Sequence, residues 1–266
     1  MTIQEALRAG VVDAGIEARE ARLLLARALH ASEAHLIGYP EKSISASAYA
    51  QFAADVARRR RGEPVAYIVG EKEFCGLALQ VTPAVLIPRP ETELLVELAL
   101  ERPFASLADL GTGSGAIAIA IGKRRPGTRV VAVEASDAAL AVARANAARH
   151  GVDIEFRRGS WLAPLAGERF DLVVANPPYV AEGDPHLAEL AFEPRAALVS
   201  GADGLDAIRQ IAGAAPAHLV RGGWLLLEHG AGQDADVRRL LEQAGLETAQ
   251  SWPDLAGIPR ASGARR

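Results

Sequence analysis

An asparagine at the end of a predicted strand is the residue of this sequence best suited to chemistry. In "FDLVVANPPYV", residues 170–180, a mostly apolar run leads into Asn176, Pro177, Pro178 and Tyr179. Asn176 offers a carbonyl acceptor and an NH₂ donor. The two prolines have a fixed φ and no N–H, and Tyr179 offers an aromatic face. The set suits a planar NH₂ group, whose hydrogens would be accepted by the Asn176 side-chain carbonyl and the Pro177 backbone carbonyl.

Two acceptors of this kind would help a poor nucleophile to react. The lone pair of an amide or aromatic amine is delocalised, and holding both hydrogens orients the nitrogen toward an in-line sulfonium methyl group. Proximity and orientation of this kind contribute up to about 7–11 kcal/mol. No general base is needed beside Asn176, because the methylated nitrogen sheds its proton readily. The four residues alone fit an ordinary turn equally well, since Asn-Pro often begins one; their place after a buried strand favours the functional interpretation.

A glycine-rich loop is the second candidate site. The segment "DLGTGSGAIAIA" places Asp109 at the end of a predicted strand and the loop 111–115 before a helix. Glycine has no Cβ, so such a loop can turn tightly and lie against a ligand. Glu134 ends the next predicted strand, about 20 residues later, where an acid can bind ribose hydroxyls. The pattern fits NAD and S-adenosylmethionine, and it disfavours a turn without a ligand.

Alternating strands and helices must position these residues. From about residue 105 the sequence predicts five strands, in "LADL", "TRVVAVEAS", "IEFRRG", "RFDLVVAN" and "GGWLLLEHG", with helices between several of them. This alternation predicts an α/β fold, a mostly parallel, doubly wound, Rossmann-like sheet with helices on both faces. Ligands of such sheets bind beyond the carboxyl ends of the strands, which is where Asn176 and the glycine loop are expected.

The first 62 residues predict a small helical domain instead. Helical spacing is clear in "ARLLLARALH" and in "SASAYAQFAADVARRRRG". The next segment predicts two short strands, "VAYIVG" and "LALQVTPAVLI", with "EKEFCG" as their turn. We therefore expect an N-terminal helical substrate-recognition domain at 1–75, a linker of a β-hairpin and a helix at 76–104, and the domain with the glycine loop at 105–266.

Composition limits the classes of function. The chain has 266 residues, of which 50% are hydrophobic, and its net charge is −4, less basic than is usual for a nucleic-acid-binding protein. The single cysteine, Cys75, excludes an internal disulfide and is typical of a reducing compartment. No histidine spacing indicates a metal site, and no segment resembles a signal peptide or a membrane span. The sequence therefore predicts a cytoplasmic protein.

Five segments together resemble the bacterial release-factor glutamine methyltransferases. They are "GEPVAYIVGEKEFCGLALQVTPAVLIPRPETELLV", "DLGTGSGAIAIA", "ANPPYV", "FEPRAALVSGADGL" and "WLLLEHG". The similarity covers nearly the whole chain, and "PRPETE" and "FEPRAAL" are its most specific parts. The resemblance implies a class I S-adenosylmethionine-dependent methyltransferase that modifies the glutamine side-chain amide in the Gly-Gly-Gln loop of class I peptide chain release factors, and so tunes translation termination.

The resemblance also implies roles for individual residues. The glutamine amide would be held by Asn176, Pro177, Pro178 and Tyr179. The cofactor would contact Asp109, Gly111, Thr112, Gly113, Ser114, Gly115, Glu134, Ser160, Trp161 and Asn176. Phe74, Arg89 and Glu91 would line the pocket. No metal, no direct nucleic-acid contact and no membrane are expected, the protein is expected to be a monomer, and the helical domain would contact the release factor.

Three features depart from the family pattern. Glu134 stands where the family usually has Asp, and Ser160 stands where it often has an acid. The C-terminal "GIPRASGARR" lacks the apolar residues of the family's last strand, so we expect a sheet one strand shorter or with a frayed edge.

Several other functions remain compatible with parts of this pattern. The alternatives are a glutamine methyltransferase acting on a ribosomal protein, an adenine or guanine amine methyltransferase acting on nucleic acid, a binding module without catalysis, and a nicotinamide oxidoreductase. The last is disfavoured because no residues suited to hydride chemistry follow the loop.

Overall fold

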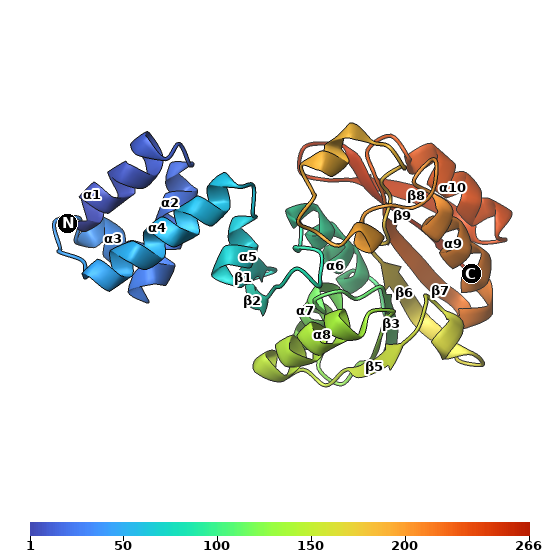
Figure 1. The fold of residues 1–266 in the computed structure, drawn as a ribbon. Coiled ribbons are helices and arrows are strands. Elements are labelled where there is room, and N and C mark those ends of the chain that lie inside the picture. The colour runs from blue at the N-terminus through green and yellow to red at the C-terminus, as the bar shows by residue number, and fades with distance from the viewer. The chain divides into compact units, whose positions relative to one another are not determined.

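The computed structural model describes residues 1–266, which form two compact units, Met1–Glu71 and Lys72–Arg266. The helices are α1 (Ile3–Arg8), α2 (Ala18–Leu29), α3 (Glu33–Gly38), α4 (Ala46–Arg60), α5 (Val65–Val69), α6 (Glu93–Leu100), α7 (Ala116–Arg124), α8 (Asp137–His150), α9 (Asp206–His218) and α10 (Asp234–Gln243). The strands are β1 (Glu71–Phe74), β2 (Leu77–Gln80), β3 (Ser106–Leu110), β4 (Arg129–Glu134), β5 (Glu155–Arg158), β6 (Phe170–Ala175), β7 (Leu219–Glu228), β8 (Glu247–Pro253) and β9 (Pro259–Arg265). Figure 1 shows both units.

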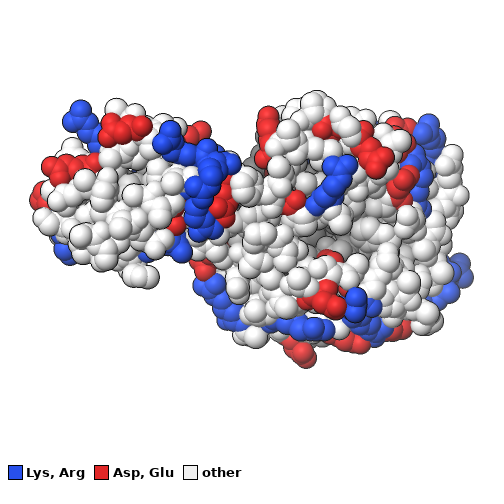
Figure 2. All heavy atoms as spheres, viewed as in Figure 1, with Lys and Arg blue, Asp and Glu red and all other residues white.

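The first unit is helical, as predicted, and has its own core. Leu24 and Leu25 of α2 pack with Phe52 and Val56 of α4 in one buried cluster. Serine and threonine side chains cap the N-termini of α1, α3 and α4, which satisfies backbone donors that a helix leaves free. Basic groups gather at the end of α4 (Figure 2). Two of these arginines are paired inside the unit, Arg58 with Glu63 and Arg59 with Glu20.

One strand predicted from "VAYIVG" is wrong, because residues 65–69 form helix α5. Pro64 precedes the helix, and Gly70 ends it in the left-handed conformation with φ 82°. Ile68 of this helix is buried in the core of the first unit, so tertiary packing outweighs the β-branched composition. The hairpin instead pairs β1 with β2 across a turn at Cys75 and Gly76.

The second unit is built on a seven-stranded sheet in the order β5-β4-β3-β6-β7-β9-β8. Strands β3 to β7 are parallel, as the alternating pattern predicts. Alternate residues of β3 enter opposite cores: Leu107 packs with α6 and α7, whereas Ala108 packs with α9. Helices therefore cover both faces of the sheet (Figure 1), and the loops after β3, β4 and β6 meet at one edge.

The expected loss or fraying of the last strand is wrong. β9 pairs antiparallel with both β7 and β8, and Ala261, Ser262 and Ala264 are at most 1% exposed. Small residues suit this position because its neighbours are large: a Cβ on Gly263 would lie 2.6 Å from Leu226 Cδ2. The sequence lacks an apolar run here because large side chains from adjacent elements fill the space.

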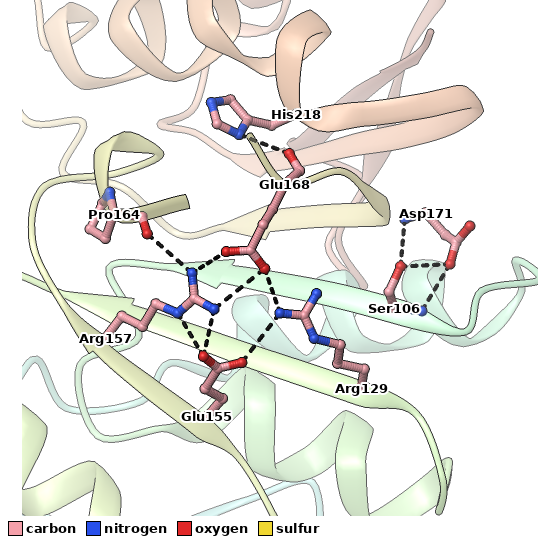
Figure 3. A network of polar contacts seen from close by, with 8 residues as sticks. All are labelled: Ser106, Arg129, Glu155, Arg157, Pro164, Glu168, Asp171 and His218. Carbon is pink, nitrogen blue, oxygen red and sulfur yellow. Dashed lines mark hydrogen bonds and ion pairs between the residues drawn. The ribbon is translucent and has the colours of Figure 1, made fainter. Parts of the chain in front are cut away.

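Charged side chains link neighbouring strands at their amino-terminal ends, opposite the ends that carry the glycine loop and Asn176 (Figure 3). Arg157 pairs with Glu155 and Glu168, and Arg129 bridges the same two carboxylates. Hydrogen bonds from Arg157 and Arg129 lower the pKa of Glu168 to about 2. The network joins the starts of β4 and β5 to the segment before β6. The candidate site lies at the other, carboxyl ends of the strands.

Candidate active site

A cavity of about 320 Å³ lies within the second unit, where the loops after β3, β4 and β6 meet. Such a volume lies at the lower end of the range for small-molecule sites. Ten of the residues predicted for the site line it: Arg89, Gly111, Thr112, Gly113, Ser114, Glu134, Ser160, Trp161, Asn176 and Pro178. The fold thus brings the glycine loop and the asparagine together across about 65 residues of sequence, as expected for parallel strands that end at one edge.

The glycine loop has the backbone that only glycine adopts easily. Gly111, Gly113 and Gly115 have φ of 69°, 57° and 84°, in the left-handed region. A Cβ on Gly111 would lie 3.0 Å from Trp161 Cζ3, so this position also needs a residue without a side chain. Trp161 itself has φ 47°, which is uncommon for a non-glycine residue and costs on the order of 1 kcal/mol or more. The close packing of the glycine loop against the Trp161 ring therefore depends on the backbone conformations of both Gly111 and Trp161.

Glu134 is the acidic side chain of the cavity. Its Oε2 accepts a hydrogen bond from the Gly113 N–H at 3.0 Å, and its Oε1 accepts one from the Ser136 N–H at 3.0 Å. An ionised carboxylate has about four acceptor positions, so both oxygens can accept further donors. The cavity therefore has an acidic side chain that can bind a diol at the end of β4.

Asp109 supports the glycine loop from below and does not line the cavity. It is 1% exposed, and its Oδ2 accepts hydrogen bonds from the Thr112 hydroxyl at 2.6 Å and the Ala118 N–H at 3.2 Å. Burial raises the pKa of Asp109 to about 6. Gly115 is likewise outside the cavity lining, as the N-cap of α7. Direct cofactor contacts were expected of both, whereas their positions are those of supports for the loop.

Phe74 also lies away from the cavity, contrary to the expected lining role. It is 1% exposed and packs with Leu79 and Leu95 in the core beneath α6 and α7. An aromatic ring next to a hairpin turn fills this core, because β1 lays its last residue against the second unit's own helices. Glu91 is exposed and is not a lining residue, whereas Arg89 is one.

Asn176 is fixed by a residue that the sequence did not single out. Its Nδ2 donates to the Thr92 hydroxyl at 3.0 Å. Its Oδ1 is buried and accepts no hydrogen bond. Thr92 is 4% exposed and lies at the start of α6, in the "PRPETE" segment. The motif "PRPETE" was the available signal for this residue, but its helix-start position concealed its role.

The other motif residues are held by the strand end. Pro178 lines the cavity, and Pro177 is buried beside it. The Tyr179 hydroxyl donates to Glu228 Oε1 at 3.3 Å. Burial, with a further contribution from the Glu228 charge, raises the pKa of Tyr179 well above its usual value. Tyr179 therefore keeps its proton and remains a donor.

The loop after β6 is anchored across the cavity by Glu193, which is 7% exposed. Its Oε2 accepts the Ile87 N–H at 3.0 Å, and its Oε1 accepts from Arg89. Pro194, Ala196 and Ala197, which follow it, line the cavity. The "FEPRAAL" segment stands out in the sequence, but its contacts could not be assigned there because they join residues more than 100 positions apart.

Two family models match this chain. The model described as "Methyltransferase small domain" matches residues 90–202, and the model described as "PrmC N-terminal domain" matches residues 5–70. The first match contains most of the cavity-lining residues, and those at 84–89 precede it. The second lies within the helical unit.

Curated relatives match almost the full length. A protein of Burkholderia pseudomallei named release factor glutamine methyltransferase is 51% identical, with 99% of this chain and 96% of that protein covered. One of the same name from Xylella fastidiosa is 51% identical, with 92% of each chain covered.

Solved structures share the fold at low identity. The Thermus thermophilus 16S rRNA N2 G1207 methyltransferase, in complex with AdoMet and guanosine, matches with a TM-score of 0.56 at 20% identity, over 74% of this chain and 49% of that one. A methyltransferase from Pyrococcus furiosus matches with a TM-score of 0.57 at 16% identity, over 80% of this chain and 98% of that one.

Proposed function

We propose, because this chain belongs to the family of release factor glutamine methyltransferases, that it methylates the side-chain amide nitrogen of a glutamine in peptide chain release factors. It is an S-adenosylmethionine-dependent enzyme, since the family uses that methyl donor. The glutamine is the one in the Gly-Gly-Gln loop of class I release factors. The proposal extends to a cytoplasmic location, since release factors act on ribosomes, and to a monomeric protein.

The cavity fits the methyl donor. The glycine loop keeps side chains out of the place where a ligand lies against the backbone, and Glu134 can accept hydrogen bonds from ribose hydroxyls. Trp161 and Ser160 line the same cavity and would border the adenine. When bound, the cofactor supplies an electrophilic methyl group attached to a positively charged sulfur.

The unpaired Asn176 oxygen is the observation that carries the choice of acceptor. Leaving a buried carbonyl without a donor costs about 1–3 kcal/mol, so the atom is expected to meet a donor when substrate binds. We assign one N–H of the glutamine amide to Asn176 Oδ1 and the other to the Pro177 carbonyl. The amide nitrogen gains the methyl group and loses one proton, which leaves to solvent.

The helical unit and Arg89 have supporting roles in this proposal. Residues 5–70 match the family's own N-terminal domain, and we assign this unit to contact with the release factor. Arg89, fixed by Glu193, lines the cavity and would help to shape the entry of the glutamine. The matched pair of domains favours a release factor over the nucleic acid of more distant relatives that share only the fold.

A transfer assay tests the substrate. The protein is incubated with methyl-labelled S-adenosylmethionine and a release factor, its Gln-to-Ala loop variant, a ribosomal protein or RNA. We expect label on the intact release factor alone. Label on RNA alone, or equal label on the Gln-to-Ala variant, would refute the proposed substrate.

The role of Asn176 is tested by Asn176→Ala. Because the variant removes the acceptor for one substrate N–H, we expect kcat to fall on the order of 10²-fold or more, as for loss of one preorganised hydrogen bond in other active sites. Calorimetry should still detect cofactor binding, since Glu134 and the glycine loop are intact. Turnover equal to that of the unsubstituted protein would contradict the assignment.

A further inference from the structure

A buried carboxylate lies next to the Asn-Pro-Pro-Tyr motif without an ion-pair partner. Glu228 is 2% exposed, accepts the Tyr179 hydroxyl at Oε1 and has no partner at Oε2. Its place follows from the sheet: β6 and β7 are parallel, with Ala175 opposite Leu227, so Asn176 and Glu228 follow neighbouring strands at the same edge. A buried carboxylate is costly unless it is hydrogen-bonded, which calls for a reason to keep it there.

Thr92 is a neighbour of both Asn176 and Glu228. Its hydroxyl accepts the Asn176 Nδ2 hydrogen at 3.0 Å. Burial raises the pKa of Glu228, and the nearby hydroxyls of Thr92 and Tyr179 oppose that rise. A hydroxyl has a single proton, and a carboxylate can only accept. If that proton goes to Glu228, the Thr92 oxygen is left facing Asn176 with lone pairs alone. Asn176 must then turn its NH₂ toward Thr92, which leaves Oδ1 as its free acceptor.

We propose that Glu228 is a positioning residue that sets, through Thr92, which end of the Asn176 amide is offered to the substrate amide. This inference rests on the proposed function. Without the carboxylate, Thr92 can donate its proton to Asn176 Oδ1 instead. The Asn176 amide then turns over and presents its NH₂ to the NH₂ of the substrate, two donors that cannot pair. The same carboxylate holds the Tyr179 hydroxyl, so one buried group orients two residues of the motif.

Four single variants and the double variant Thr92→Val/Glu228→Met test this proposed relay from Glu228 through Thr92 to Asn176. Thr92→Val keeps the side-chain shape but removes the hydroxyl, and Glu228→Met keeps an apolar chain of similar length but removes the acceptor. Thr92→Ser and Glu228→Gln are the matched conservative variants, since each keeps an oxygen that can serve the hydrogen bond. The measurements are kcat and KM for the release factor, cofactor affinity by calorimetry and the midpoint of thermal unfolding.

We expect Thr92→Val and Glu228→Met each to lower kcat about 10- to 100-fold, the equivalent of one misdirected buried hydrogen bond. Cofactor affinity should change less than about threefold, because the glycine loop and Glu134 are untouched. The kcat of the double variant should be no lower than that of the slower single variant, because both substitutions interrupt the same relay. Thr92→Ser and Glu228→Gln should recover most of the rate.

Three results would overturn the relay. They are an unchanged kcat in a folded Thr92→Val protein that binds cofactor, losses that multiply in the double variant, or no recovery by the two conservative variants. All three results are interpreted only if the unsubstituted protein methylates the release factor. If the unsubstituted form does not label the release factor, the proposed function fails, and that result is separate from the comparison among variants.

Discussion

At the scale of single residues, three buried oxygens near the cavity have no hydrogen-bond partner: Asp109 Oδ1, Asn176 Oδ1 and Glu228 Oε2. Most buried polar atoms in proteins are paired, so unpaired ones concentrate where a ligand or a functional constraint retains them. Of the three residues, Asn176 alone lines the cavity. Asp109 and Glu228 lie one layer behind it, Asp109 holding the glycine loop and Glu228 the motif. The residues that line the cavity are thus supported from behind by two buried carboxyl groups, those of Asp109 and Glu228.

The ionisation of Glu228 predicts a pH dependence. The pKa of Glu228 is raised to about 7, chiefly by burial and to a smaller extent by the Glu91 charge, against the opposing effects of the Thr92 and Tyr179 hydroxyls and the Arg260 charge. His229, the next residue, has its pKa lowered by burial, so it stays neutral at this pH. An ionised carboxyl can only accept from Thr92, whereas a protonated one can also donate to Thr92 and so free the Thr92 proton for Asn176 Oδ1. The value of kcat should therefore rise with pH through about 7 and level off above it.

Rates of methyl transfer measured from about pH 5.5 to about pH 8.5, roughly one and a half units either side of that pKa, check this expectation. Glu228→Gln cannot ionise, so its profile should lose the rise. A rise that persists unchanged in Glu228→Gln would assign it to another group.

Gly111 predicts a specific loss of cofactor binding. Alanine at φ 69° is strained by about 1–2 kcal/mol, and its Cβ would press on Trp161 at 3.0 Å. We expect Gly111→Ala to weaken S-adenosylmethionine binding about tenfold or more, measured by calorimetry. Gly127→Ala is the matched control, because Gly127 has φ 87° and an added Cβ there would have no neighbouring atom within 4 Å. Equal losses in both variants would mean that backbone strain alone, and not the contact with Trp161, accounts for the effect.

At the scale of elements, the antiparallel pair β8 and β9 completes the sheet beyond the parallel strands. β9 lies between β7 and β8, so it supports the strand whose end presents Glu228. Ser262 of β9 also hydrogen-bonds His229 Nε2 at 2.8 Å. The small side chains of β9 therefore allow it to pack closely against β7 and support that strand, although they give no apolar strand pattern in the sequence.

Gly263 predicts the cost of a larger residue in β9. A Cβ would lie 2.6 Å from both the Leu225 carbonyl oxygen and Leu226 Cδ2, so Gly263→Val should destabilise the fold by about 1–3 kcal/mol or more. Chemical unfolding measures the change. The control is Gly213→Ala in α9, where a Cβ has no neighbour within 4 Å and the higher helix propensity of alanine should add up to about 1 kcal/mol of stability. An unchanged midpoint for Gly263→Val would mean that β9 can shift away from β7.

At the scale of the whole molecule, the two units have separate hydrophobic cores. The core of Met1–Glu71 contains only residues from that unit, and the cavity is lined only by residues 84–197. None of the helices combines the length and the apolar character that crossing a membrane requires. The structure also contains no group of three or more His, Cys, Asp or Glu side chains placed to hold a metal ion.

Removal of the helical unit tests its assignment to the release factor. A chain of residues 72–266 keeps all cavity-lining residues, so its affinity for S-adenosylmethionine should stay close to that of the full chain. Its kcat/KM for the release factor should fall about tenfold or more, as expected if a contact worth at least about 1.4 kcal/mol is lost. Kinetics with intact release factor and calorimetry with cofactor separate the two effects. Full activity of the shortened chain would contradict a recognition role for the helical unit.

The sequence by itself determined the parallel α/β sheet, the helical first unit and the two loops that line the cavity. These follow from local patterns: apolar strands that alternate with helices, glycines where φ must be positive, and Asn176 directly after a buried strand. The family resemblance added the identity of the methyl donor and of the acceptor.

Tertiary structure alone decided the rest. Residues 65–69 are helical because Ile68 packs in a core, and β9 is a strand because large neighbours fill the space beside its small residues. Phe74 belongs to a core and not to the cavity, and Thr92 reaches Asn176 across 84 positions. Contacts between distant segments leave no periodic signal in either segment, so only folding reveals which polar atom faces which partner.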